Sequence, residues 1–505
     1  MKINITEYLK ETATKYSSKI AIEDKNGQIT FSELEVNAYN LANHILRIEP
    51  ELNNSPIPVF LPKEKETIIS FIGVVLSGNF YVPLDVKSPI QRLDKIFEKL
   101  DSKILITSKK FESILSKTSF EGRFIYIEDL SENPCNENEK SIIENKLQSK
   151  IDLDPVYSIF TSGSTGTPKG VLISHRGVID YIEWAKEVYS VDENEIIGSQ
   201  APFYFDNSTL DIYLMLATGA KLIIVPEEKY MFPVKLLEYI NQKQITFVFW
   251  VPSVLVNAAN LKALENNSVD SLHKILFAGE VMPNKHLNYW RKEKPDALYS
   301  NLYGPTEITV DCTYYIVDRE FKDEEPLPIG KACRNTDLLI LNEKDELCAS
   351  EEIGELCVKG SSLAFGYYKD FEKTESVFVQ NPVNNDYREI IYRTGDLVFV
   401  NERDEIIFVG RKDSQIKHMG YRIELGEIEN IILGIEEIEN ICVIYDSERK
   451  IIKAYYIGEI EFIEIRKKLV SLLPKYMIPT KWFKTESFPY NSNGKIDRKK
   501  IVEVI

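Results

Sequence analysis

The sequence has no long hydrophobic run and no excess of basic residues. No stretch of about 18 consecutive apolar residues occurs in the 505 residues, so no membrane-spanning helix is expected. The N-terminal segment, MKINITEYLKETATKY, is amphipathic and charged, unlike a secretory signal peptide. Lysine and arginine total 61 against 78 acidic residues, a formal net charge of −17. This balance disfavours binding to nucleic acid or to an anionic membrane, because both require a basic protein surface.

Cysteine is also sparse. The six cysteines form no C-x-x-C pair and have no histidines at ligand spacing, so a structural zinc site is not expected. A chain of this size needs no disulfide framework. Internal repeats and low-complexity tracts are absent as well. The hydrophobic content of 44% is enough for a packed core in more than one folding unit.

Short apolar strands alternate with helical patterns over the first four-fifths of the chain. A capping box formed by Ser32 and Glu35 would begin one helix. Its apolar face carries Leu34, Ala38, Leu41, Ala42 and Ile45. Candidate strands are residues 104–107, 124–127, 221–225, 246–251 and 274–277. The polar segment 131–150 is expected to be a surface excursion. The alternation predicts an α/β fold with mixed, largely parallel sheets flanked by helices.

A second unit is predicted after residue 412. Residues 424–433 and 463–473 have helical patterns, and residues 441–445 and 453–457 have strand patterns. We therefore predict a large N-terminal domain, residues 1–412, and a small mobile α+β domain, residues 413–505. The hinge is expected near Asp413.

The strongest motif is TSGSTGTPKG at residues 161–170, directly after an apolar run. Glycines and small hydroxyl residues let backbone N–H groups and side-chain oxygens approach a phosphate, and Lys169 adds a positive charge. The motif is not a Walker loop, because Pro168 and Gly170 flank the lysine where glycine and Ser or Thr would be needed. A merely flexible loop is the alternative for any Gly/Ser/Thr stretch, but the motif favours a phosphate-binding loop.

This loop resembles the phosphate-loop signature of the adenylate-forming superfamily, which includes acyl-CoA synthetases, luciferases and the adenylation domains of nonribosomal peptide synthetases. Further motifs follow in the order of that family and cover nearly the whole chain. They are ITFSEL at 29–34, LSGNFYVPLD at 76–85, NLYGPTE at 301–307, GELCVKGSSLAFGYY at 354–368, YRTGDL at 392–397, GRKDSQIKHMGYRIELGEIE at 410–429, LPKYMIP at 473–479 and NGKIDR at 493–498.

The resemblance implies that a carboxylate attacks the α-phosphate of ATP and that pyrophosphate leaves, with Mg²⁺ assisting and without a tightly bound organic cofactor. Because both reactants are anions, the site must supply positive charge and hydrogen-bond donors. The expected nucleotide-binding residues are Thr161, Ser162, Gly163, Ser164, Thr165, Gly166, Lys169, Gly279, Glu280, Asn301, Leu302, Tyr303, Gly304, Pro305, Thr306, Asp396, Phe408, Arg411 and Lys495.

Individual roles are implied by the same resemblance. Tyr303 would stack near the adenine, Asn301 would meet its edge, and Asp396 would accept both ribose hydroxyls. Arg411 would also reach the ribose. Taken alone, Asp396 could be only a turn residue after Gly395.

Three residues are expected to be catalytic. Thr306 would contact the α-phosphate, Glu307 would hold Mg²⁺, and Lys495 would bridge the substrate carboxylate to the nucleotide. Outside this series of motifs, Glu307 could be only an acidic residue at a helix start and Lys495 only a solvated lysine.

Asp206 indicates the substrate class. In relatives that activate α-amino acids, the matching aspartate pairs with the substrate ammonium, and a buried carboxylate is costly unless a cation meets it. The alternative is an aspartate that caps the helix pattern at 209–216. The predicted substrate-binding residues are Phe205, Asp206, Asn207, Leu210, Phe249, Leu276, Ala278, Leu302, Val310, Asp311 and Lys495. Their bulk favours a small or medium side chain, and Asp311 either meets a polar group or faces away.

The acceptor is expected to be a thiol on a separate molecule. No phosphopantetheine-accepting serine motif and no HHxxxDG motif occur, so we expect a phosphopantetheinylated carrier protein or coenzyme A. Asp413 would act as the hinge, and Gly420 would let the pantetheine arm pass. An ATP-dependent enzyme of this kind is expected in the cytoplasm.

Stand-alone amino acid adenylation enzymes such as D-alanine:carrier-protein ligases are the closest in length and in AGEVMP at 278–283. D-alanine or another small amino acid is therefore the leading candidate substrate, although Ala278 replaces their usual cysteine and Asp311 is not typical of them. An acyl- or aryl-CoA ligase is an alternative that Asp206 disfavours. A non-catalytic ATP-binding relative is another, which the retained Lys495, Glu307 and Asp396 disfavour. The side chain and chirality of the substrate, the pathway and the oligomeric state stay open.

Overall fold

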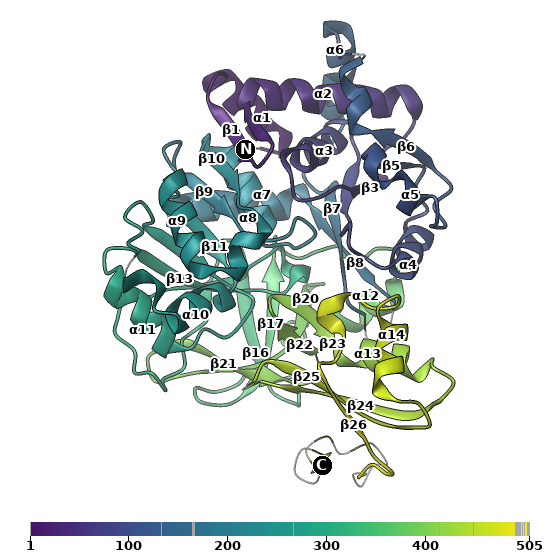
Figure 1. Ribbon diagram of the computed structural model, residues 1–505. Coiled ribbons are helices and arrows are strands. Elements are labelled where there is room, and N and C mark those ends of the chain that lie inside the picture. The colour runs from purple at the N-terminus through teal and green to yellow at the C-terminus, as the bar shows by residue number, and fades with distance from the viewer. Residues whose placement is uncertain are drawn as a thin grey trace.

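The computed structural model describes residues 2–132, 134–163, 167–265, 267–413, 415–447, 449–489, 496, 498, 500 and 501. Two large sheets make up the N-terminal part, with helices between them and on their outer faces (Figure 1). Helix α3 (Lys65–Leu76) contacts strands of both sheets and therefore lies between them. The predicted α/β class is confirmed.

Among the described residues the largest sheet has nine strands. Its order is β15 (Lys331–Ala332), β14 (Thr313–Ile316), β13 (Leu298–Tyr303), β12 (Lys274–Phe277), β11 (Phe247–Trp250), β9 (Ile196–Ser199), β10 (Lys221–Ile224), β1 (Ile20–Asp24) and β2 (Gly27–Thr30). The strands from β13 to β1 pair in parallel. They are buried on both faces and are nearly continuous hydrophobic runs, as parallel strands covered by helices require.

The second sheet has seven strands. Its order is β18 (Gly366–Tyr367), β8 (Lys169–Ser174), β7 (Pro155–Thr161), β4 (Phe80–Pro83), β3 (Pro56–Phe60), β5 (Ile104–Thr107) and β6 (Arg123–Tyr126). Strands β7, β4, β3, β5 and β6 pair in parallel, whereas β8 and β18 are antiparallel. The two sheets share one hydrophobic core.

The helices of the N-terminal part are α1 (Thr6–Lys15), α2 (Phe31–Ile48), α3, α4 (Ile90–Leu100), α5 (Glu112–Leu115), α6 (Glu137–Gln148), α7 (His175–Val188), α8 (Ser208–Thr218), α9 (Pro233–Lys243), α10 (Pro252–Asn260), α11 (Asn284–Glu293) and α12 (Phe371–Val377). Single turns of 3₁₀ helix include η3 (Glu227–Met231) and η5 (Thr306–Ile308). None of the helices in the described ranges is long and apolar enough to cross a bilayer.

One local prediction was wrong. Helix α2 begins one residue before Ser32, and its capping box is formed by Thr30 and Glu33, because the Thr30 side chain accepts from the Glu33 amide. The predicted apolar face of α2 is buried as expected. Within segment 131–150, residues 137–148 form α6, capped by Asn136. Only Ile143 and Leu147 of this helix are buried, so the segment lies at the surface as predicted.

A third sheet and a C-terminal region complete the fold. The third sheet contains β16 (Thr336–Leu341), β17 (Gly354–Gly360), β20 (Ile390–Val400), β19 (Phe378–Gln380) and β21 (Ile406–Arg411). The C-terminal region contains the hairpin β22 (Gln415–His418) and β23 (Tyr421–Glu424), α13 (Leu425–Leu433), β24 (Ile438–Asp446), β25 (Ile451–Gly458), α14 (Phe462–Leu469), 3₁₀ turn η6 (Lys475–Met477) and β26 (Lys481–Lys484). This region has its own hydrophobic core, and its hairpin lies at the junction with the large sheets (Figure 1).

Candidate functional site

The residues predicted to bind nucleotide and substrate gather where parallel strands end. Strand β11 ends at Trp250, β12 at Phe277, β13 at Tyr303 and, in the other sheet, β7 at Thr161. The carboxyl ends of parallel strands meet at one edge of a sheet, which is where open α/β sheets bind their ligands. The fold therefore brings motifs up to 250 residues apart into one cleft.

The phosphate loop leaves β7 at this edge. The Ser162 hydroxyl donates to the carbonyl of Arg422 at 2.9 Å. Lys169 is buried beside the Tyr367 hydroxyl at 3.3 Å, and burial lowers the pKa of Lys169 to about 8. A Cβ on Gly163 would lie 2.1 Å from the Thr167 carbonyl oxygen, so only glycine fits this turn. Ser164, Thr165 and Gly166 lie outside the described residues, as does Lys495.

Asp396 on β20 lies between two of the other predicted nucleotide residues. One carboxylate oxygen accepts from the Tyr303 hydroxyl, and the other accepts from Arg411 Nη1 at 2.6 Å. Phe408 packs against the Tyr303 ring with centroids 6.3 Å apart. Both oxygens of Asp396 therefore have partners at this edge, and the aromatic faces beside them form a wall suited to a planar base.

The other predicted nucleotide residues on β13 and in the turn that follows it are close to these groups. Asn301 is buried, and its side-chain amide donates to the Pro328 carbonyl at 2.8 Å. Leu302 and Tyr303 are buried, Pro305 precedes η5, and Gly304 faces the turn at Val310. A Cβ on Gly304 would lie 2.2 Å from the Val310 carbonyl oxygen, so glycine is required at 304.

Glu307 is completely buried in η5 and is surrounded by donors. One oxygen accepts from the Tyr367 hydroxyl at 2.7 Å and lies 3.5 Å from Lys169 Nζ, and the other accepts from Arg422 Nη1 at 2.5 Å. Burial acts to raise the pKa of Glu307, but the charges of Arg422 and Lys169 hold it well below its usual range. The carboxylate is therefore ionised and neutralised by protein cations.

Glu307 could hold Mg²⁺ only when Arg422 has withdrawn. A magnesium ion commonly takes one or two protein carboxylates and completes its shell with water and substrate phosphates, so a single carboxylate is sufficient. No cluster of three or more metal-ligating side chains occurs in the described part of the chain. In the present arrangement Arg422, on the hairpin of the C-terminal region, donates a hydrogen bond to one of the two Glu307 carboxylate oxygens.

Asp206 lies in the loop between β9 and α8 and is half-buried. Burial raises the pKa of Asp206, and a hydrogen bond from Thr306 and the charge of Lys417 act in the opposite direction. The residue before α8 is Asn207, and no side chain caps this helix. The Asp206 carboxylate is therefore not used as a helix cap, and it faces Thr306 and Lys417.

Most of the other predicted substrate residues are buried, and the apolar ones among the buried residues belong to one hydrophobic core cluster. Seven of these residues are at most 3% exposed: Leu210, Phe249, Leu276, Ala278, Leu302, Val310 and Asp311. Phe205 lies against Tyr421 with ring centroids 4.8 Å apart. Such packing leaves little free space among these side chains.

Asp311 has a protein partner. Its carboxylate accepts from the Tyr181 hydroxyl of α7 at 2.6 Å. Burial raises the pKa of Asp311 to about 7, and the hydrogen bond from Tyr181 offsets only part of that effect. The preceding residues, Thr309 and Val310, have φ of 59° and 74°. Positive φ is costly for β-branched residues and is found mainly at functional sites, so this turn is held in place by its surroundings.

The hairpin β22–β23 enters the cleft. Lys417 and Arg422 face each other across the hairpin, so both side chains lie on the same face. Lys417 Nζ lies 5.5 Å from the centre of the Tyr303 ring. Burial lowers the pKa of Lys417, although Asp396 and Asp206 are close enough to raise it. One ammonium group therefore serves both acidic side chains of the cleft.

The tip of the hairpin is bound to the loops after β11 and β12. Met419 and Gly420 have φ of 53° and 82°, as the two central residues of a type I′ turn require. The Gly420 amide donates to one Glu280 oxygen at 3.1 Å, and the other oxygen accepts from the Ser253 amide at 2.9 Å. Glu280, next to Gly279, thus fastens the hairpin in the cleft.

Asp413 at the end of β21 is bound by Arg411. Arg411 Nε and Nη2 donate to its two oxygens at 2.7 and 2.9 Å, and the Gln415 amide donates to it at 3.1 Å. Asp413 therefore forms an ion pair with Arg411 in this arrangement.

A comparison with known protein families agrees with the resemblance that the motifs indicated. The AMP-binding enzyme family matches residues 9–368. The chain belongs to the AMP-binding enzyme family. The adenylate-forming superfamily that its motifs predicted is thereby confirmed.

Two relatives are similar to this AMP-binding enzyme over nearly its whole length. Zwittermicin A synthase ZmaJ of Bacillus cereus is 32% identical, and the alignment covers 99% of this chain and 94% of that protein. Gramicidin S synthase 1 of Brevibacillus brevis is also 32% identical over 99% of this chain, which spans only 44% of that synthase.

Solved structures confirm the fold of this AMP-binding enzyme. The Vibrio cholerae adenylation domain AlmE, solved with glycyl-adenosine-5'-phosphate, superposes with a TM-score of 0.85 at 21% identity and covers 100% of this chain and 98% of its own. Holo-PA1221, an NRPS protein containing adenylation and PCP domains, gives a TM-score of 0.84 at 22% identity and covers 99% and 84%.

Several residues of the cleft escaped the sequence analysis. Tyr181 lies outside every motif, and Tyr367, Lys417 and Arg422 lie within motifs but were given no role. A usable signal existed for two of them: a tight turn at Met419-Gly420 puts Lys417 and Arg422 opposite each other. Tyr181 and Tyr367 come from distant segments, so nothing local identifies them.

Proposed function

We propose that this AMP-binding enzyme activates an amino acid as aminoacyl-AMP, releases pyrophosphate, and transfers the aminoacyl group to the phosphopantetheine thiol of a separate carrier protein. A small amino acid is favoured, and D-alanine is one candidate. We propose that it works in the cytoplasm, where ATP is available. Belonging to an adenylate-forming family supports the first step, and the residues of the cleft support the choice of substrate.

The position of Lys417 is the observation that carries the amino acid proposal. A lysine ammonium lies close enough to the half-buried Asp206 to oppose the effect of burial on its pKa. When the hairpin withdraws, Asp206 would face the cleft without that cation, and an α-ammonium group would restore the balance. A deaminated acid would leave the carboxylate unpaired, so the site discriminates against it.

The first half-reaction would use the cleft with the hairpin withdrawn. Thr161 to Gly166 and Lys169 would hold the phosphates, Tyr303 and Phe408 would flank the adenine, and Asp396 would bind the ribose. Mg²⁺ on Glu307 would supply positive charge to the phosphates. Thr306, one residue before Glu307 and bonded to Asp206, is placed to orient the reacting groups. Lys495 would bridge the carboxylate and the nucleotide.

The second half-reaction would use the present arrangement. Arg422 on Glu307 and Lys417 near Asp396 would maintain the positive charge of the cleft after pyrophosphate has left. Gly420 has no Cβ, and a Cβ added at this position would lie 2.9 Å from Val251. The passage for the pantetheine arm beside this turn is therefore expected to require glycine. Rotation at Asp413 would exchange the two arrangements.

Pyrophosphate exchange with a panel of glycine, L- and D-amino acids and their deaminated counterparts tests the proposal. We expect exchange with one or a few small amino acids and none with the matching acids. Exchange that is as strong with a deaminated acid would refute amino acid activation and favour an acyl-CoA ligase.

A further inference from the structure

A lysine outside every motif connects the two large sheets directly behind the loop that carries Asp206. Lys63 follows β3 in one sheet. Its ammonium donates to the carbonyl of Ser199 at 2.9 Å and of Gln200 at 2.8 Å, at the end of β9 in the other sheet. Residues 200–207 then form the loop with Phe205, Asp206 and Asn207. Lys63 thus binds the point where this loop begins.

The same ammonium acts on the helix where the loop ends. Asp211 is in the first turn of α8 and is completely buried. Neither of its carboxylate oxygens has a hydrogen bond of normal geometry among the described residues, although the Ser199 hydroxyl is close enough to lower the pKa of Asp211. Burial raises the pKa of Asp211 and lowers that of Lys63, and the two charges oppose these effects on each other. Lys63 therefore interacts with both ends of the Asp206 loop.

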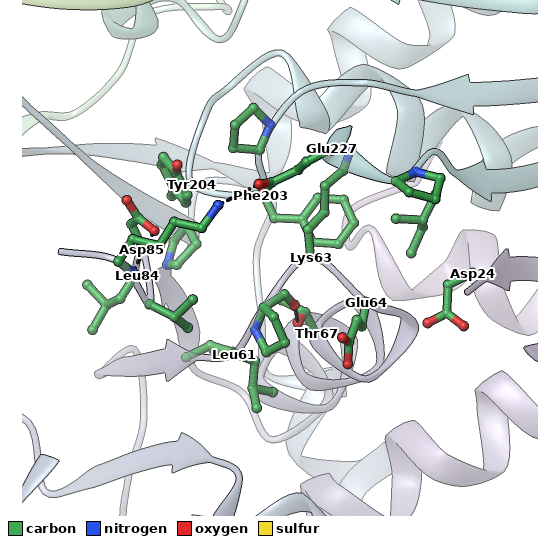
Figure 2. Close-up of a pocket in the computed structure, with 18 of the residues that line it drawn as sticks. Asp24, Leu61, Lys63, Glu64, Thr67, Leu84, Asp85, Phe203, Tyr204 and Glu227 are labelled. Carbon is green, nitrogen blue, oxygen red and sulfur yellow. Dashed lines mark hydrogen bonds and ion pairs between the residues drawn. The ribbon is translucent and has the colours of Figure 1, made fainter. Parts of the chain in front are cut away.

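One side of this loop is incompletely packed, although the Phe203 side chain is itself buried. A cavity of about 250 Å³ lies there, bounded by Pro202, Phe203 and Tyr204 of the loop and by Leu61 and Leu84 at the ends of β3 and β4. Figure 2 shows Lys63 beside Phe203 in the wall of this cavity, and its ammonium lies 5.7 Å from the centre of the Phe203 ring. Because the loop borders this cavity on one side, the two Lys63 hydrogen bonds help to hold its start in place, together with the packing of Phe203 against Phe71.

We propose that Lys63 is a positioning residue for substrate recognition, which holds the 200–207 loop so that Asp206 meets the substrate amine. The proposal rests on the proposed function for the role of Asp206. The alternative is that Lys63 and Asp211 form only a stabilising charge pair in the core. The two differ because Lys63 bonds carbonyl groups that Asp211 does not touch.

The test measures KM for amino acid and for ATP by pyrophosphate exchange in four variants. Lys63→Met should raise the amino acid KM at least about tenfold and change the ATP KM less than about twofold, the effect of losing hydrogen bonds to a charged donor. Lys63→Arg should stay within about threefold of the wild type, because a guanidinium can donate to two carbonyls. Lys65→Met is the matched control, since Lys65 pairs with Asp24 at 3.2 Å and not with the loop.

The double variant Lys63→Met/Asp211→Asn separates the two explanations. It leaves no unpaired buried charge, so its melting temperature should recover relative to Lys63→Met. Its amino acid KM should stay high because the carbonyl bonds are still missing. Recovery of the KM in the double variant, or a parallel rise of both KM values in Lys63→Met, would overturn the proposal.

Hydrogen–deuterium exchange gives a readout that does not depend on the substrate. Amides of residues 199–208 should exchange faster in Lys63→Met than in the wild type and in Lys65→Met. Unchanged exchange would refute positioning even if activity fell. If Asp206→Ala leaves the amino acid KM unchanged while the loop still loosens in Lys63→Met, then amine recognition by Asp206 fails and positioning by Lys63 stands.

Discussion

Replacing Arg422 by methionine should separate the two half-reactions. Arg422 Nη1 lies 2.5 Å from a Glu307 oxygen, and both side chains are largely or fully buried. Hydrogen bonds to charged groups contribute about 1.5–3 kcal/mol. The remaining partners of Glu307, Lys169 and Tyr367, limit the cost to this range. The docked hairpin should therefore be destabilised by roughly 10- to 150-fold, since about 1.4 kcal/mol is a factor of ten.

The assay compares pyrophosphate exchange with thioester formation on a phosphopantetheinylated carrier at several Mg²⁺ concentrations. In Arg422→Met, thioester formation should fall by about tenfold or more, and exchange should change by less than about threefold. Half-maximal exchange should require less Mg²⁺, because a competing cation at Glu307 has been removed.

Arg92→Met is the matched control. Arg92 Nη1 bonds Glu427 at 3.0 Å across the same junction but does not touch Glu307. This variant should slow thioester formation without changing the Mg²⁺ dependence. The reasoning fails if Arg422→Met slows both half-reactions equally, or if its Mg²⁺ dependence matches that of Arg92→Met.

Four further variants test a catalytic lysine, the hinge, the turn glycine and a buried histidine. Lys495→Ala should lower adenylate formation about 10²–10³-fold, the size expected for one preorganised charge, and should affect transfer of a preformed adenylate much less; equal losses would indicate a structural role. Asp413→Pro fixes φ at residue 413 near −65°, so pyrophosphate exchange should continue while thioester formation falls at least about tenfold. Gly420→Leu should have the same two effects. Parallel loss of both activities in these variants would exclude domain alternation. Burial lowers the pKa of His175 to about 3. The unfolded state therefore binds more protons below about pH 6.5, and stability should fall by up to about 1.4 kcal/mol per pH unit between 6.5 and 3. Urea unfolding of His175→Gln should show a shallower loss over that range, and an unchanged slope would contradict this origin.

Strands could be predicted where hydrophobic runs are short and bounded. Strands β5 and β12 match their predicted ranges, because parallel strands buried on both faces are continuous apolar runs. Boundaries that depend on one hydrogen bond were less accurate. The start of α2 depends on whether the side chain of Thr30 or that of Ser32 accepts a hydrogen bond from a backbone amide. Each of these residues is followed three positions later by glutamate, so the sequence alone does not distinguish them.

The motifs located the cleft but not the partners within it. The predicted residues from 161 to 311 lie at or near the carboxyl ends of parallel strands, as in other open α/β sheets. Asp396, Phe408 and Arg411 instead lie on the antiparallel strands β20 and β21. The Asp311–Tyr181 bond joins residues 130 positions apart, and no local pattern indicates it. Lys63 was missed for a similar reason, since its two carbonyl partners belong to the other sheet.

The amine of the substrate offers the most direct test. Pyrophosphate exchange should be measured for wild type and Asp206→Ala with the preferred amino acid and with its deaminated acid. The account predicts that Asp206→Ala raises the amino acid KM at least about tenfold, leaves the ATP KM nearly unchanged, and narrows the preference of the wild type for the amino acid over the acid. An Asp206→Ala enzyme with wild-type amino acid kinetics would contradict it.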